Sequence, residues 1–97
     1  MKSTKTVREI FAREYVYCKY HRFLGYMLAL ERDSLADINY RNAEDHEHAC
    51  EILLEIFPDL NDVNTDPLID EAIKMQEDAY AVLHRDDPVF QELNRRG

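Results

Sequence analysis

Residues that interrupt helices are scarce in this chain, which has two glycines and three prolines among 97 residues. So few breaks, with 45% hydrophobic residues, favour an all-α fold. Serine is equally scarce, occurring only as Ser3 and Ser34, and the Gly-x-Ser-x-Gly motif is absent, as is a glycine-rich phosphate loop. Because no motif for hydrolysis or phosphoryl transfer is present, we expect no enzymatic activity and no cofactor.

Cysteines and long apolar runs are also few. Cys18 and Cys50 could form one disulfide at most, and no Cys-x-x-Cys spacing indicates a zinc ribbon or a redox pair. Both lie in apolar helical stretches, so we expect buried thiols. The first five residues lead into charges and no run of 18 apolar residues occurs. We therefore expect no signal peptide, no membrane association and a cytoplasmic location.

The charge of −8 is unevenly distributed along the sequence. Residues 1–32 carry seven Lys and Arg against three acids, whereas residues 33–97 carry five against 17. One interpretation is that a basic first helix lies against acidic neighbours. The other is that the later helices present a negative surface to a basic partner protein. Direct binding to nucleic acid is disfavoured, because phosphate-binding surfaces need clustered Lys and Arg.

Apolar periodicity and helix-capping signals divide the chain into helices. The first is expected within Lys5–Arg32, capped by Ser3, Thr4 or Thr6. The second is expected over Leu35–Phe57, with Ser34 and Asp37 as a capping box and Pro58 ending it. Its predicted inner face consists of Leu35, Ile38, Asn42, Ala49, Leu53 and Ile56, flanked by Ile52 and Phe57.

The rest of the chain contains one loop, over residues 58–66, and two more helical segments. Asp66 followed by Pro67 predicts the start of a third helix that runs to residue 84 or 85. Asp87 followed by Pro88 predicts a short closing helix over residues 89–93. The sequence therefore predicts one domain, residues 1–97. Its fold is a small antiparallel helical bundle, a long helical hairpin plus a third helix and a short C-terminal helix.

The first helix has an unusually wide apolar surface made of two stripes. One stripe, at alternating spacings of four and three, consists of Val16, Tyr20, Phe23, Met27 and Leu30. The other consists of Ile10, Tyr17, Leu24 and Leu28. Such a helix is covered either by two neighbouring helices or by one neighbour and a second subunit. We expect a homodimer that uses the first stripe as its interface, because Tyr, Phe and Met are enriched in such surfaces.

Potential metal ligands lie on the inner edges of the predicted hairpin. Glu14, Cys18 and His21 are close on the first helix, as are Asp45, His46 and Cys50 on the second. An antiparallel hairpin brings the two groups to a similar level. They could form a zinc or iron site, or His21 with Asp45 or His46 could form a structural polar pair beside packing cysteines.

Two further motifs resemble metal sites only in part. Asp45 and His48 have the carboxylate–histidine spacing of ferritin-like di-iron bundles, but His48 falls on the outer face, where it suits a surface ion pair. Asp62, Asn64 and Asp66 begin like a calcium-binding loop. That loop also requires a glycine at position six and a glutamate at position twelve, which this chain lacks.

These observations favour a small, acidic, non-enzymatic protein–protein interaction module. A specific form of this interpretation is an inhibitor or regulator whose acidic helix faces bind a basic, nucleic-acid-type site on a partner. The acidic partner-binding face is predicted at Glu44, Glu51, Glu55, Asp70, Glu77 and Asp78. The alternative is a metal-binding helical bundle with carboxylate and histidine ligands across the hairpin or a dimer interface.

Overall fold

A computed structural model describes residues 1–84 of the chain, and over that range the protein is all-α. Its elements are α1 (Lys5–Leu30), α2 (Leu35–Ile56), the 3₁₀ helix η1 (Pro58–Asp62) and α3 (Asp66–Leu83). The predicted helical hairpin and third helix are thus confirmed. The predicted closing helix over residues 89–93 lies outside the described residues. None of the described helices is both long and apolar enough to cross a membrane.

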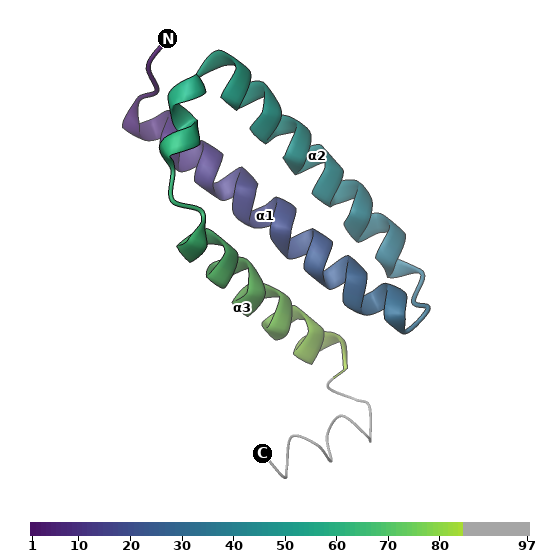
Figure 1. The fold of residues 1–97 in the computed structure, drawn as a ribbon. Coiled ribbons are helices and arrows are strands. Elements are labelled where there is room, and N and C mark those ends of the chain that lie inside the picture. Colours follow the sequence, from purple (N-terminus) through teal and green to yellow (C-terminus); the bar gives the residue numbers. More distant parts are fainter. Residues whose placement is uncertain (85–97) are drawn as a thin grey trace.

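The three long helices form an open, single layer. α1 lies between α2 and α3, antiparallel to α2, and η1 crosses near the N-terminal end of α1 (Figure 1). α1 packs along both neighbours, whereas α2 and α3 share no extended contact within residues 1–84. The two shorter dimensions of the molecule, 27 and 16 Å, fit a layer three helices wide and one helix thick. The wide apolar surface of α1 is therefore explained by two neighbouring helices.

Several of the buried residues in the contact between α1 and α2 are small. Gly25 is buried on α1, and the residues of α2 that are buried against α1 include Ala36 and Ala43. A Cβ atom added to Gly25 would lie 3.2 Å from two ring carbons of Tyr40 and 3.3 Å from the Cβ of Asn39. The absent side chain thus lets the two helices approach closely, and the Tyr40 ring covers the backbone of α1.

This contact corrects the predicted orientation of α2. The buried residues of α2 are Ala36, Ala43 and Cys50, at intervals of seven. Of the larger side chains predicted to face inward or to flank that face, Leu53 and Phe57 do pack against the core cluster of Phe11, Cys50 and Leu60. Four of those larger side chains are exposed: Leu35, Ile38, Ile52 and Ile56. α2 is rotated so that the side carrying Ala36, Ala43 and Cys50 faces α1. These small side chains allow the two helices to pack more closely than a row of isoleucines would.

The ends of α1 are satisfied by local hydrogen bonds. Thr4 is the N-cap, and its Oγ1 accepts a hydrogen bond from the N–H of Val7 at 3.2 Å. At the other end Arg32 has a φ of 58°, and the N–H of Asp33 donates to the carbonyl of Leu28 at 2.9 Å. This is a Schellman-type ending, in which the left-handed position is usually glycine. The sequence contains no glycine there to signal it.

Two predicted caps differ from those in the structure. Ser34 makes no side-chain capping bond to α2, and instead Asp33 Oδ1 accepts from the N–H of Leu35 at 2.9 Å. Asp66 is the first residue of α3 and not its N-cap, and its N–H donates to Asn64 Oδ1 at 3.1 Å. In both turns a short polar side chain two residues earlier accepts the bond, which is an Asx-type turn.

The predicted loop over residues 58–66 contains η1, which closes one end of the α1–α2 hairpin. Leu60 is buried there in a cluster with Phe11 and Cys50. The carboxylate of Asp59 accepts bonds from the N–H of Ser3 at 3.1 Å and lies 3.6 Å from Arg8 Nη1. Hydrogen bonding from Ser3 is the main cause that lowers the pKa of Asp59.

α3 is attached to the outer side of α1, more loosely than α2. Ala72 is its one fully buried residue, whereas the large apolar side chains of Ile73 and Leu83 are 39% and 48% exposed. Its C-terminal end is held at the end of α1, where Tyr80 donates a hydrogen bond to Glu31 and His84 Nε2 lies 3.0 Å from Glu31 Oε2. α3 is therefore held on α1 by apolar packing together with these polar contacts at its C-terminal end.

The close approach at Gly25 predicts a specific sensitivity to side-chain size. We expect Gly25→Leu to lower the free energy of unfolding by about 2 kcal/mol, because the new carbons must displace Tyr40. The control is Ala29→Leu, at an exposed position of the same helix, which should change it by less than about 0.5 kcal/mol. Urea denaturation measures both, and equal losses in the two variants would contradict the close approach.

Candidate functional site

A polar seam lies between α1 and α2 and consists of Glu14, His21, Asn39 and His46. His21 Nδ1 is hydrogen-bonded to Asn39 Oδ1 at 2.9 Å, and His46 Nδ1 is hydrogen-bonded to Glu14 Oε2. All four side chains are half-buried. The two imidazoles stack between these bonds, with centroids 5.8 Å apart and an interplanar angle of 3°.

The seam contains hydrogen-bonded polar pairs, but not the pair of His21 with Asp45 or His46 that the sequence suggested. His21 and His46 do lie at the same level, as the antiparallel hairpin predicted, but their hydrogen-bond partners are Asn39 and Glu14. Asp45, the other predicted partner, is exposed. Among residues 1–84 no three His, Cys, Asp or Glu side chains are grouped so that they could hold a metal ion. The described residues therefore offer no support for the metal-binding alternative.

Aromatic rings and one further ion pair extend the contact between the two helices. The Tyr17 ring lies 5.5 Å from the His46 ring, and the Tyr20 ring lies 4.7 Å from that of His21. Arg22 donates a hydrogen bond to Glu47. The sequence analysis did not identify Asn39, Arg22 or Glu47 as parts of this contact. The antiparallel register would have pointed to the Arg22–Glu47 pair, since these residues lie at nearly equal distances from the turn.

Cys18 and Cys50 line a cleft of about 230 Å³ between α1 and α2. Both thiols are buried and form no disulfide, as the sequence predicted for packing residues. Burial raises the pKa of Cys18, although the nearby Arg22 and Lys19 oppose the shift. Burial also raises the pKa of Cys50 to about 12. A nucleophilic cysteine requires a lowered pKa, so neither thiol is prepared for catalysis.

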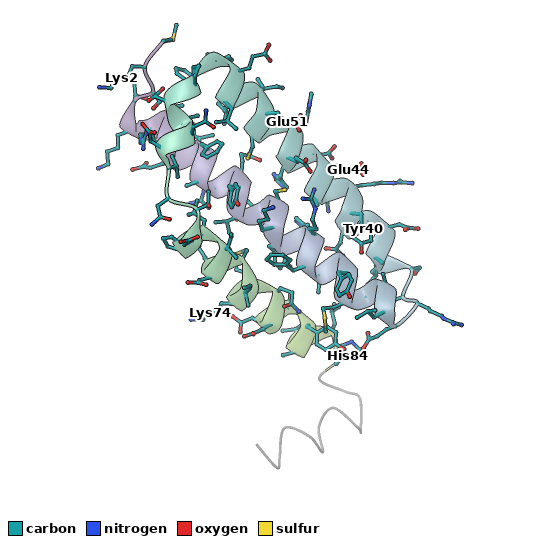
Figure 2. All side chains as sticks on the ribbon, in the orientation of Figure 1. Lys2, Tyr40, Glu44, Glu51, Lys74 and His84 are labelled. Carbon is teal, nitrogen blue, oxygen red and sulfur yellow. The ribbon has the colours of Figure 1, made fainter. Side chains whose placement is uncertain are left out.

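The predicted acidic face divides into two, one on each outer helix. Glu44, Glu51 and Glu55 are exposed on α2, and the same holds on α3 for Asp70, Glu77 and Asp78. The side chains of Glu44 and Glu51 extend from α2 into solvent, and Lys74 does so from α3 (Figure 2). Of these six acids, only Glu51 has an ion-pair partner within residues 1–84, the exposed His48 at 3.8 Å.

The predicted dimer stripe on α1 is partly used within the chain. Val16 is 5% exposed and lines a cleft of about 440 Å³ between α1 and α3, together with Leu68 and Met75. Tyr20, Phe23 and Met27 are half-buried, and Leu30 is exposed. α3 therefore covers part of the surface that the sequence analysis assigned to a second subunit.

Comparison with protein-family models, with curated protein sequences and with solved structures gave no match to this chain. Its function must therefore be argued from its own residues and geometry.

The raised pKa of Cys50 predicts how stability depends on alkaline pH. The unfolded thiol, with a pKa near 9.0, ionises before the folded one, whose pKa is about 12. The free energy of unfolding should therefore fall as pH rises from 9 towards 12, with a contribution from this group of about 1.4 kcal/mol per pH unit.

Tyrosine side chains in general also ionise in this pH range. The readout is therefore the difference in the free energy of unfolding between the wild type and Cys50→Ala. We expect this difference, measured by urea denaturation, to shrink as pH rises, since the variant has lost the thiol whose ionisation favours unfolding. A difference that stays constant from pH 8 to 11 would show that the Cys50 thiol is not shielded from water in the folded state.

Proposed function

We propose that this protein is a non-enzymatic interaction module that binds a basic site on a partner protein through the acidic faces of α2 and α3. The observation that carries the proposal is the exposure of six acidic side chains on the two outer helices, five of them without an ion-pair partner within residues 1–84.

The distribution of cations supports this proposal. α2 carries six acidic residues against Arg41 as its only Lys or Arg, and α3 carries five against Lys74. On α1, by contrast, Arg8 and Arg22 pair with acids of the later chain. Intramolecular neutralisation thus takes place around α1, and the outer helices keep their negative charge for a partner. Such a surface attracts and orients a basic partner at long range.

The chemistry of the two faces specifies the kind of partner. Rows of carboxylates on a helix can occupy a site whose Lys and Arg side chains otherwise bind nucleic-acid phosphates. In that arrangement the protein acts as an inhibitor or regulator, because its binding excludes the nucleic acid. Dissolved salt screens the attraction between exposed charges. The affinity for the partner should therefore fall at least about tenfold when the salt concentration rises from about 0.1 to 0.5 M.

Three charge-reversal variants with the same net charge test the proposal. Glu51→Lys/Glu55→Lys alters the α2 face and Glu77→Lys/Asp78→Lys alters the α3 face. Glu9→Lys/Asp62→Lys is the control, at exposed residues outside both faces. Each immobilised variant is used to capture proteins from an extract of the source cell, and captured proteins are identified by mass spectrometry and titrated at low and high salt.

We expect the wild type and the control variant to capture the same basic protein, and at least one face variant to lose it. If the two face variants and the control variant all capture the same amount of this protein, its binding follows the shared net charge and does not depend on either acidic face. Binding that does not respond to salt, or capture of no basic protein by the wild type, would contradict the proposal.

A further inference from the structure

Four large aliphatic side chains of α2 lie on an exposed stripe that takes no part in the core or in the acidic faces. The outer stripe, as we name it, consists of Leu35, Ile38, Asn42, Asp45, Ala49, Ile52 and Ile56. Its spacings alternate between three and four residues, the pattern by which one helix packs along another. Four of its members are large and apolar, and their exposed fractions are 41% for Leu35, 54% for Ile38, 43% for Ile52 and 48% for Ile56. No element within residues 1–84 covers them.

We propose that the outer stripe is an interface between two copies of this chain, in which two α2 helices pack antiparallel about a two-fold axis near Asp45. The inference is independent of the proposed function, because it rests on different residues. A two-fold dimer interface must be self-complementary: if residue i of one copy contacts residue j of the other, then residue j of the first copy contacts residue i of the second. The outer stripe meets this condition.

The order of residues along the stripe provides the self-complementarity. In an antiparallel pair, Leu35 of one copy lies level with Ile56 of the other, and Ile38 lies level with Ile52. Apolar residues thus meet at both ends of the interface, Asn42 lies level with Ala49, and the two Asp45 residues meet at the axis. A parallel pair would also match the apolar ends, but it would place α1 and η1 of the two copies at the same end of the dimer.

The charges beside the stripe favour the same pairing. The axis brings the two Asp45 carboxylates together, which alone would oppose association. Arg41 lies four residues earlier on the same helix. In the antiparallel pair it is displaced from Asp45 of the other copy by about four residues, or roughly 6 Å along the axis, which an arginine side chain can span. Each arginine can therefore neutralise an aspartate of the other copy.

The area of the stripe predicts a weak dimer. Four half-exposed aliphatic side chains offer on the order of 300 Å² of apolar surface per copy, against roughly 800 Å² per partner in a standard interface. Each copy also carries a net charge of −8. Association should therefore depend on concentration and should strengthen with salt, which screens repulsion between the copies. This is opposite to the salt dependence expected for a basic partner.

Sedimentation velocity over a range of protein and salt concentrations tests the assignment. We expect the wild type to reach twice the monomer mass at high concentration, and Ile38→Ser/Ile52→Ser to remain a monomer. The matched control is Ile10→Ser/Leu30→Ser, which removes two exposed apolar side chains from α1 and should leave the dimer intact. Circular dichroism confirms that each variant is folded. All four residues are exposed, so none is required for the core.

Cysteine cross-linking tests the direction of pairing. A mixture of Ile38→Cys and Ile52→Cys chains should form mixed disulfides faster than either chain alone, because the antiparallel arrangement brings these positions together. Faster cross-linking of either chain with itself would show a parallel pair and overturn the proposed geometry. A wild type that stays monomeric at every concentration would overturn the interface, as would a dimer that the α1 variant abolishes and the α2 variant does not.

Discussion

The close contact between α1 and α2 determines how the rest of this protein is arranged. Gly25 has no side chain, and α2 meets α1 with Ala36, Ala43 and Cys50, so the two backbones can approach until the Tyr40 ring lies on the α1 backbone. This contact fixes the rotation of α2. With Ala36, Ala43 and Cys50 facing inward, Leu53 and Leu54 still pack beside Cys50 in the core. The side chains of Leu35, Ile38, Ile52 and Ile56 are left exposed, and no other element within residues 1–84 covers them.

An open layer follows from that rotation. α1 is used on both sides, by α2 and by α3, and two of its five Lys and Arg residues, Arg8 and Arg22, pair with acids of η1 and α2. The outer helices keep their acidic side chains and, on α2, an apolar stripe. Two different kinds of surface are therefore exposed within residues 1–84, rows of carboxylates on α2 and α3 and an apolar stripe on α2. In our proposals, the carboxylates bind a basic partner in a way that weakens with salt, and the stripe forms a dimer that strengthens with it.

Much of the architecture could be predicted from the sequence, and the errors have a common cause. The helix boundaries, the hairpin turn near Asp33 and the burial of both cysteines were right, because breakers and apolar periodicity are local signals. The inner face of α2 was wrong. Periodicity identifies an apolar stripe but not which side a neighbouring helix prefers, and here small residues at intervals of seven prevailed over a stripe of isoleucine and leucine.

The candidate site was predictable to a similar degree. The antiparallel register correctly brought His21 to the level of His46, but it could not identify Asn39 and Glu14 as the hydrogen-bond partners, since that depends on side-chain direction. The six acids of the predicted faces are all exposed. Whether they bind a partner stays a prediction, as does a dimer interface on α1, whose stripe α3 covers in part.

The central claim is that four aliphatic side chains of α2, Leu35, Ile38, Ile52 and Ile56, face away from the remainder of the fold. Methyl–methyl nuclear Overhauser effects in an isotopically labelled sample test it most directly. The account predicts contacts from α1 methyl groups to both α2 and α3, and none between Ile38 or Ile52 of α2 and Leu68, Ile69 or Ile73 of α3. Strong contacts between these two sets would show a closed three-helix bundle with α2 facing inward, and would contradict the account.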